Sequence, residues 1–403
     1  MIFMDFTFVG RDMLNQLTDY EILGLRGGHN LSDGHAYHDI HESFPGFPSQ
    51  LQDIWQESES TKVNIAELRF KASFAKLIGS EVLESLTHFK VSPTASNSID
   101  LVAAYLAIKS PRIVLVSPTF DNLALLLQRR GCDLQLIEDS YFRTADNALR
   151  LFTKLDSLNF DTLFLVNPNN PTGTVIKEQY MQQIAGYCAE RKKALVLDTT
   201  FRLYANRLYD DRAILERSGC EYFIIEDTGK TWPTHDMKAS LISYSERSAR
   251  LFEIIYDEVY LCHSRFTMLT FERLFDQTLK QGISKSIHDP VNFRHSFLLS
   301  RMKNTIALPT TDRRSASLPL EWFQVESTKY SDLDIVEYLA TKDVHVLPGR
   351  FFYWESNSTP PCTAFRVSLS RVNSRFQKSV EHLHSALVEF ESEHRMESEN
   401  VLS

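Results

Sequence analysis

Short apolar runs alternate with helical segments across the middle of this 403-residue chain, and this alternation constrains the fold more than any other feature. The apolar runs occupy residues 112–116, 162–166, 194–197, 222–225 and 240–244. Helical patterns fill residues 99–109, 122–130 and 177–192. Strands that alternate with helices in this way form a mostly parallel sheet with helices on both faces. We therefore predict an α/β fold.

A chemically useful side chain follows the end of four of these runs. Phe120, Asn170, Asp198 and Lys230 each come shortly after a different predicted strand. In open α/β sheets, ligands bind beyond the carboxyl ends of the strands. We therefore expect these four side chains to meet in one site.

Together these residues suit an aldehyde cofactor that has a ring nitrogen and a phosphate. Lys230 would form the Schiff base, Asp198 would keep the ring nitrogen protonated, and Phe120 would stack on the ring. Asn170 would donate to the ring oxygen. Residues 94–98, including Ala95 and Ser96, form a turn that opens a helix, and its free N–H groups favour a phosphate.

At this point the chain resembles the fold-type I pyridoxal 5′-phosphate (PLP) enzymes of the aminotransferase class. The run NPNNPTG at residues 167–173 is the most specific motif, with Asn170 as the ring-oxygen ligand. Arg366 in FRVSLSR resembles the arginine that binds the substrate α-carboxylate, although an ordinary surface ion pair is the alternative. The resemblance implies a seven-stranded type of large-domain sheet, a smaller α+β domain and a homodimer.

The same resemblance suggests three segments. We expect residues 1–45 to form an N-terminal helix and a lid that packs with the small domain. Residues 46–290 would form the PLP-binding domain, and residues 291–403 the small C-terminal domain. Within the first segment, a short helix is expected at residues 17–23, with Thr18 or Asp19 as its N-cap.

Three positions depart from an ordinary aminotransferase. Phe201 stands where a tyrosine normally bonds the ring oxygen, and Asp227 where a phosphate-binding serine is usual. Lys238 replaces the usual phosphate-binding arginine. Because an aspartate beside a phosphate would be repelled, we expect Asp227 to face a cation, such as a substrate guanidinium or ammonium.

Five segments resemble a narrower group, the PLP- and O2-dependent L-arginine oxidases of natural-product pathways. These segments are LTDYEILGL, NLSDGHA, PTFDN, IEDTGKTWPTHDMKA and FRVSLSR. By this resemblance Thr18, Glu21 and Asp227 contact the guanidinium, His35 governs proton transfer and water attack, and the N-terminal segment closes over substrate. From the residues alone, Glu21 would be read as part of a solvated helix face.

The implied reaction oxidises L-arginine with O2 through quinonoid intermediates, without a flavin or a metal. The product would be 4-hydroxy-2-ketoarginine, 2-ketoarginine or a dehydroarginine. Three alternatives stay open: a PLP-dependent cyclase or lyase acting on a hydroxyarginine, an ordinary aminotransferase, and a protein of this fold that has lost catalysis.

Composition narrows the function classes further. The chain is 43% hydrophobic with a net charge of −9, and its charges are mixed along the sequence, which argues against nucleic acid as a partner. The acidic first 14 residues make a poor signal peptide, and no apolar run approaches the length of a membrane span. We therefore predict a cytoplasmic protein that does not bind membranes.

Metal binding is not favoured by the sequence. Five scattered cysteines without a CxxC pair indicate reduced thiols rather than a zinc or iron–sulfur site. His35, His38 and His41 are spaced by three, which leaves metal ligation, one catalytic or substrate-gating histidine, or plain surface histidines as alternatives.

Overall fold

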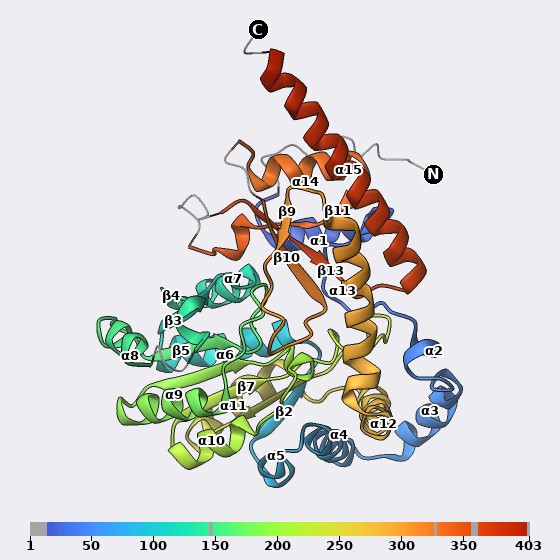
Figure 1. The fold of residues 1–403 in the computed structure, drawn as a ribbon. Coiled ribbons are helices and arrows are strands. Elements are labelled where there is room, and N and C mark those ends of the chain that lie inside the picture. The colour runs from blue at the N-terminus through green and yellow to red at the C-terminus, as the bar shows by residue number, and fades with distance from the viewer. Residues whose placement is uncertain (1–13, 145–147, 326–328, 356–361, 401–403) are drawn as a thin grey trace.

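The computed structural model describes residues 14–144, 148–325, 329–355 and 362–400. Residues 1–13, which bear on the signal-peptide prediction, lie outside this description. Figure 1 shows a large body around one twisted sheet and a smaller body around a second sheet, with α13 (Asp289–Met302) running between them. In the described residues, no helix is both long and apolar enough to cross a membrane. All five cysteines are free thiols.

The large sheet has seven strands in the order β2-β8-β7-β6-β5-β3-β4. Only β8 runs antiparallel to its neighbours, and the other pairings are parallel. The strands are β2 (Phe89–Ser92), β3 (Arg112–Ser117), β4 (Asp133–Glu138), β5 (Thr162–Val166), β6 (Ala194–Asp198), β7 (Glu221–Ile225) and β8 (Ser240–Tyr244). The predicted mostly parallel α/β sheet is therefore confirmed, and the carboxyl ends of β3, β5, β6 and β7 share one edge.

Two groups of helices flank this sheet (Figure 1). In one group α6 packs against α7 and α11, and in the other α9 packs against α8 and α10. The helices are α6 (Ala95–Lys109), α7 (Asp121–Arg129), α8 (Ala148–Asp156), α9 (Glu178–Glu190), α10 (Asp211–Ser218) and α11 (Glu246–Val259). The central strands are buried along their length, as expected for a sheet covered on both faces.

The smaller body is an antiparallel sheet in the order β12-β13-β10-β9, covered by helices. Its strands are β9 (Ala307–Pro309), β10 (Leu320–Val325), β12 (Leu347–Pro348) and β13 (Ala364–Ser368), and its helices include α14 (Asp332–Thr341) and α15 (Asn373–Asn400). At the other end of the molecule, α12 (Arg265–Gln281) packs on α3 (Leu51–Ser60) and α4 (Val63–Ile78). The positive φ of Gly79 ends α4, as its sequence predicts.

The N-terminal segment bridges the two bodies. Helix α1 (Leu17–Arg26) leads into β1 (His29–Asn30), which pairs in parallel with β11 (Val344–His345) of the small body. Further on, the N–H of Ala36 donates to the carbonyl of Gly229 in the large body, at 3.0 Å. The predicted N-cap was wrong: Gln16 caps α1, and Asp19 is the reciprocal third residue of its capping box.

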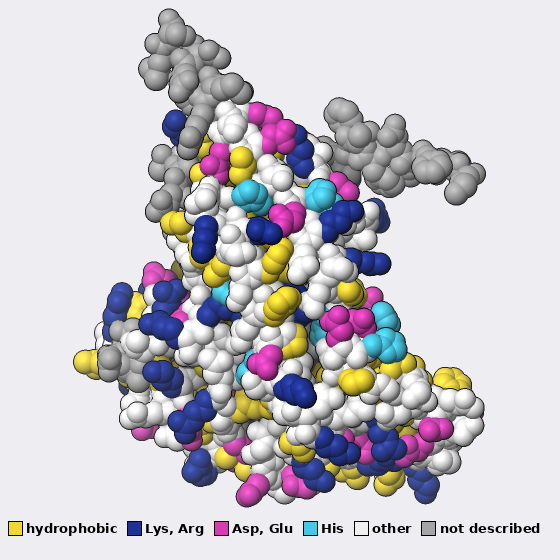
Figure 2. Space-filling model, turned by 45° about the vertical axis from the view of Figure 1, so that its right-hand side comes forward, with side chains coloured by type: hydrophobic (Ala, Val, Ile, Leu, Met, Phe, Trp, Pro, Cys, Tyr) yellow, Lys and Arg dark blue, Asp and Glu magenta, His cyan; other side chains and the backbone are white. Residues whose placement is uncertain are grey.

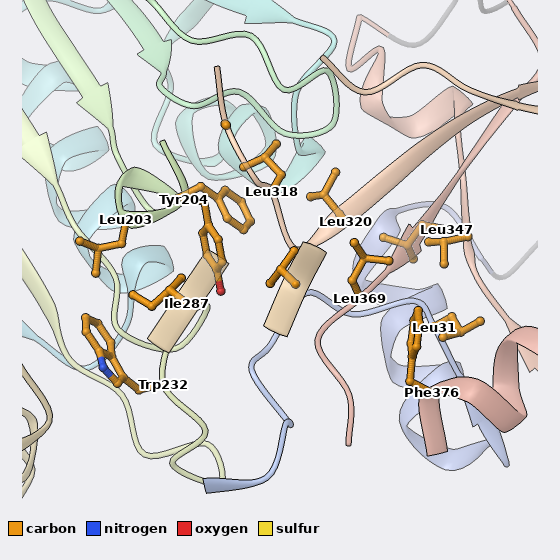
Figure 3. Packing of buried hydrophobic residues seen from close by; sticks show 14 of the residues in the cluster. Leu31, Leu203, Tyr204, Trp232, Ile287, Leu318, Leu320, Leu347, Leu369 and Phe376 are labelled. Atoms are coloured by element: carbon orange, nitrogen blue, oxygen red, sulfur yellow. The ribbon is translucent and has the colours of Figure 1, made fainter. Parts of the chain in front are cut away.

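One continuous apolar core joins the bodies (Figure 3). It extends from Trp232 and Leu203, beside the large sheet, to Leu31 and Phe376 near the N-terminal segment. Trp232 is fully buried, lies 4.9 Å from the Phe275 ring and donates its Nε1–H to Thr278 Oγ1. This packing fixes the loop that carries the predicted reactive lysine.

Mixed charge covers the face seen in the space-filling view. Figure 2 shows Lys and Arg side chains interspersed with Asp and Glu over both bodies. This distribution agrees with the even spread of charge along the sequence.

Candidate active site

A cavity of about 360 Å³ lies beyond the carboxyl ends of the parallel strands, between the large body, α1 and β13. Every side chain predicted from the sequence to act in the site lines this cavity. They are Thr18, Glu21, His35, Ala95, Ser96, Phe120, Asn170, Asp198, Asp227, Lys230, Lys238 and Arg366. The convergence inferred from strand ends alone is therefore present in the fold, while the individual roles stay predictions.

Lys230 lies in a tight turn after β7. The N–H groups of Thr231 and Trp232 donate to the carbonyl of Thr228, and the Tyr204 hydroxyl donates to the carbonyl of Lys230 at 2.7 Å. Among the described residues, none forms a hydrogen bond or ion pair with Lys230 Nζ. Hydrogen bonds thus fix the backbone around Lys230, while its amine remains available to a ligand in the cavity.

Gly34 of the N-terminal segment closes over this amine. A Cβ added to Gly34 would lie 3.8 Å from Lys230 Nζ and 3.9 Å from Arg366 Nη2. These are ordinary contact distances, so a larger side chain would fill the space between the lysine and the arginine. The absence of a side chain at Gly34 keeps that space open for a ligand.

Asp198 ends β6 at the floor of the cavity. Its Oδ1 accepts hydrogen bonds from the N–H of Thr200 (2.9 Å) and from the Thr200 hydroxyl (2.6 Å). Burial raises the pKa of Asp198 to about 6, although the two bonds from Thr200 act in the opposite direction. A cationic partner would remove this penalty, so the site suits a protonated ring nitrogen. The sequence analysis did not identify Thr200.

Two aromatic side chains and an amide form the walls. Phe120 precedes α7 and meets Phe352 edge-on at 6.2 Å between centroids. Phe201 is buried beside Tyr204, at 6.1 Å between centroids, and brings no hydroxyl to the cavity. Asn170 Oδ1 accepts from Arg366 Nη1 at 3.2 Å, and no described residue accepts from its Nδ2. The amide N–H group is therefore left to donate to a ligand oxygen.

The start of α6 forms the anion-binding end. Thr94 caps this helix by accepting from the N–H of Asn97, and no described residue accepts from the N–H of Ser96, which lines the cavity. Asp227 Oδ2 accepts from the N–H of Ala95 at 3.1 Å, and its Oδ1 accepts from Gly229. Asp227 thus faces a helix N-terminus in this conformation. Its predicted contact with a substrate guanidinium stays a prediction.

His35 lies between an acid and a base. Its Nδ1 is 3.0 Å from Asp33 Oδ1, and its Nε2 is 2.8 Å from Lys238 Nζ. An ammonium group can only donate, so Nε2 accepts and Nδ1–H donates to Asp33. The Lys230 charge, followed by burial, lowers the pKa of His35. His35 is therefore a neutral imidazole with a defined tautomer.

Asp33 was not singled out in the sequence, although it lies inside the NLSDGHA segment. It is fully buried, and Arg371 Nη2 donates to its Oδ2 at 2.6 Å. Burial opposes ionisation, but the hydrogen bond from His35 and the Arg371 charge outweigh it and hold the pKa of Asp33 well below its ordinary value. Of the three evenly spaced histidines, only His35 lines this cavity. His38 and His41 line a separate one.

Arg366 occupies the small-body side of the cavity. It is 1% exposed, so the alternative of a surface ion pair is wrong. Its Nη2 donates to the carbonyl of Ser32 at 2.6 Å, and its Nε is buried without a partner in the described structure. The Phe352 and Phe120 rings lie 5.5 and 5.9 Å from its guanidinium carbon. An orphaned N–H group on a buried guanidinium fits a carboxylate ligand.

Glu21 projects from α1 toward the same space. Its Oε1 lies 3.7 Å from Arg366 Nη2, and its side chain is 14% exposed. The alternative of a solvated helix face is therefore wrong for Glu21. Thr18, one turn earlier on α1, lines the cavity beside it.

These residues fit PLP. Within the described residues, the Lys230 amine and the Asn170 amide N–H have no partner, the buried Asp198 carboxyl has no cation, and the N–H of Ser96 is left at the start of α6. Lys238 reaches the same end of the cavity, where it can contact a phosphate. Each element of the cofactor therefore has a partner of suitable chemistry within one cavity.

Several solved structures have a fold similar to that of this chain. A structure of MppP soaked with the product 2-ketoarginine matches with a TM-score of 0.80 at 28% identity, over 89% of this chain and 99% of that one. Aspartate aminotransferase from Thermus thermophilus, with maleate, matches at 0.73 and 14% identity, over 93% and 97%. LysN, an α-aminoadipate aminotransferase also from Thermus thermophilus, matches at 0.74 and 15%, over 94% and 96%. The last two similarities show the fold alone.

Sequence comparisons agree. Threonine-phosphate decarboxylase from Salmonella typhimurium is 32% identical over 109 residues, which span 26% of this chain and 28% of that protein. A family model described as aminotransferase class I and II matches residues 63–383, most of the chain. The chain therefore belongs to the class I and II aminotransferase family, with the fold-type I architecture and the PLP dependence that its sequence predicts.

Proposed function

We propose that this enzyme oxidises L-arginine with O2 as the electron acceptor. The observation that carries the proposal is the pair formed by Glu21 and Arg366, which places opposite charges at one end of the cavity. A substrate with an α-carboxylate and a cationic side chain can satisfy both charges. The similarity to MppP, whose structure was determined with 2-ketoarginine, supports arginine as that substrate.

Binding would exchange one ion pair for two. The substrate carboxylate would take Arg366 through its unpartnered Nε–H and through Nη2, which Glu21 would give up, because these two donors lie on one edge of the guanidinium. The substrate guanidinium would take Glu21, with Thr18 beside it. The Nδ2–H of Asn170 would donate to the cofactor while its Oδ1 keeps the bond from Arg366 Nη1.

The reacting end is served by Lys230 and Asp198. Bound PLP supplies an electron sink that makes the substrate Cα–H acidic. Lys230 Nζ would remove that proton, while the Tyr204 hydroxyl holds the lysine backbone in place. Asp198, anchored by Thr200, would hold the proton on the ring nitrogen. With Phe201 in place of a hydroxyl donor, the ring oxygen would depend on Asn170 alone.

His35 would act on water. Its neutral imidazole has an Nδ1–H fixed by Asp33, and its Nε2 lone pair would become available when Lys238 Nζ leaves it for the cofactor phosphate. It could therefore accept a proton from a water that adds to an unsaturated substrate carbon, giving 4-hydroxy-2-ketoarginine. One oxidation followed by hydrolysis of the resulting imine would release ammonia and 2-ketoarginine, whereas a second oxidation creates the unsaturated carbon. Without water addition, that doubly oxidised species would give a dehydroarginine product. In each oxidation the substrate loses two electrons and two protons, which reduce O2 to H2O2.

The test is incubation of the purified yellow holoenzyme with L-arginine, with and without O2, and mass analysis of the products. O2 uptake with a 2-keto or hydroxy-keto product supports the proposal. Turnover that continues under strict anaerobiosis would refute it and would indicate a cyclase or lyase. A requirement for a keto-acid acceptor, without O2 uptake, would indicate an aminotransferase.

A further inference from the structure

Asp121 makes a buried contact that has no role in the proposed reaction. It is the first residue of α7, immediately after Phe120. Its Oδ2 accepts a buried hydrogen bond from the backbone N–H of Leu17, the first residue of α1, at 2.8 Å. The two residues are 104 positions apart in the chain, so this bond fastens the N-terminal helix directly to the loop that carries Phe120.

The bond has a defined role in α1. The first N–H groups of a helix lack partners within the helix. In α1 the Asp19 carboxylate accepts from the N–H groups of Asn15 and Gln16, and Asp121 takes the next one, that of Leu17. Asp121 is thus an N-terminal cap supplied from another element. Glu21 follows Leu17 by four residues and shares its helix face, so fixing Leu17 orients Glu21.

A buried aspartate is an energetically unfavourable choice for a helix cap. Asp121 is 5% exposed, and its Oδ1 is buried without a hydrogen-bond partner in the described part of the chain. Burial, together with the negative charges of Glu21 and Asp19 on α1, raises its pKa to about 7, against the N–H groups of Leu17 and Asn122. The facing cation is Arg366 of β13. A serine or asparagine could cap α1 without this cost.

We propose that Asp121 is a positioning residue that latches α1 over the cavity and orients Glu21 toward the substrate guanidinium. The second half of this inference rests on the proposed function; the first half does not. Because Arg366 lies 3.7 Å from Glu21, the contact between Asp121 and Leu17 would hold Glu21 in place beside Arg366 before substrate binds.

The latch is tested without arginine. In the Asp121→Ala holoenzyme, the backbone amides of residues 17–26 should exchange with deuterium at least tenfold faster than in wild type. The cofactor absorbance should be unchanged. Asp121→Asn, which keeps an acceptor oxygen, should exchange more slowly than Asp121→Ala. Asp53→Ala, an exposed aspartate in the first turn of α3, is the matched control and should match wild type. Unchanged exchange in Asp121→Ala would overturn the proposal.

The orientation of Glu21 is tested with two ligands. L-Norvaline shares the α-carboxylate and an alkyl side chain with arginine but has no guanidinium. Asp121→Ala should raise the KM for L-arginine about tenfold, change kcat less, and leave inhibition by L-norvaline unchanged. Equally weakened binding of L-arginine and L-norvaline would overturn the role of Asp121 in orienting Glu21. If the amides exchange faster but wild-type enzyme does not oxidise arginine, the latch stands and the proposed function fails.

Discussion

Oε1 of Glu21 lies 3.7 Å from Nη2 of Arg366, so the two charges that we assign to opposite ends of the substrate neutralise each other before it binds. Both groups are largely removed from water, where an unpaired charge is costly. A ligand that carries a carboxylate and a cation can part this pair and leave no charge uncompensated. A ligand with only the carboxylate leaves Glu21 without a partner, so the pair itself selects for a cationic side chain.

Replacing Glu21 by Gln should therefore weaken the binding of L-arginine selectively. A hydrogen bond to a charged group contributes about 1.5–3 kcal/mol, so we expect the KM for L-arginine to rise about 10- to 100-fold. Inhibition by L-norvaline should change little or improve, because Arg366 is released from Glu21. Steady-state kinetics with both ligands check this. Equal losses for the two ligands would contradict the assignment of Glu21 to the guanidinium.

Asp227→Ser should strengthen cofactor binding. The Asp227 carboxylate occupies the N–H of Ala95, at the helix N-terminus where a phosphate is expected. Two anions there repel each other, whereas a serine can donate to a phosphate. We expect a several-fold lower dissociation constant for PLP in equilibrium dialysis, together with weaker arginine binding if Asp227 also meets the guanidinium. Weaker PLP binding in this variant would show that Asp227 assists the phosphate instead.

The convergence of Lys230, Asp198, Asn170 and Phe120 could be predicted from sequence because it follows from topology. Each residue comes just after a buried strand, and parallel strands end at one edge of a sheet. Strands β2 and β4 were not predicted as such: one has four residues, and the other has exposed ends. Their short or partly polar patterns give a weak periodicity, although the seven-stranded type of sheet followed from the family resemblance.

The contacts around His35 and Asp121 could not be predicted, since they join residues that only the folded chain brings together. Asp33 is two residues from His35, but its bond to Arg371 joins positions 338 apart. The Asp121 bond to Leu17 likewise depends on where α1 docks. Local rules favoured Thr18 or Asp19 as the cap of α1. The tertiary contact at Leu17 and the side chain of Gln16 took that role instead.

His35→Ala should change the products more than the rate of arginine oxidation. The Asp33 bond keeps the proton on Nδ1, so Nε2, once Lys238 Nζ leaves it, is the proton acceptor that we assign to water. Removal of His35 should shift the products from 4-hydroxy-2-ketoarginine toward products without the hydroxyl group, measured by mass spectrometry of complete reactions. Asp33→Asn should shift the products in the same direction, because the amide no longer enforces the tautomer. An unchanged product ratio in both variants would refute the role of His35.

Stability beneath the site depends on a buried ion network that the sequence analysis missed. Arg202 pairs with Asp211 and Glu226, and Arg212 pairs with Glu226, all nearly fully buried. Glu226 adjoins Asp227, so the network supports the turn that leads to Lys230. Removing one member of such a network costs about 3–5 kcal/mol, because it leaves buried charge unpaired. Glu226→Ala should lose about this much in urea unfolding.

A matched control separates this effect from a general loss of a glutamate. Glu258 is exposed on α11, and its replacement by Ala should change the free energy of unfolding by no more than about 0.5 kcal/mol. If Glu226→Ala were as stable as Glu258→Ala, the network would contribute no net stability. The charges of Arg202 and Arg212 would then be compensated elsewhere.

The contact between Asp121 and Leu17 should depend on pH. The folded pKa of Asp121, about 7, lies above its ordinary value, so docking of α1 favours the neutral carboxyl. Docking is therefore fully stabilised below the ordinary pKa and weakens as pH rises through about 7. In substrate-free holoenzyme, protection factors of the α1 amides should fall between pH 6 and 8, and Asp121→Asn should remove this dependence. Protection that is independent of pH in wild-type enzyme would show that Asp121 does not titrate in the latch.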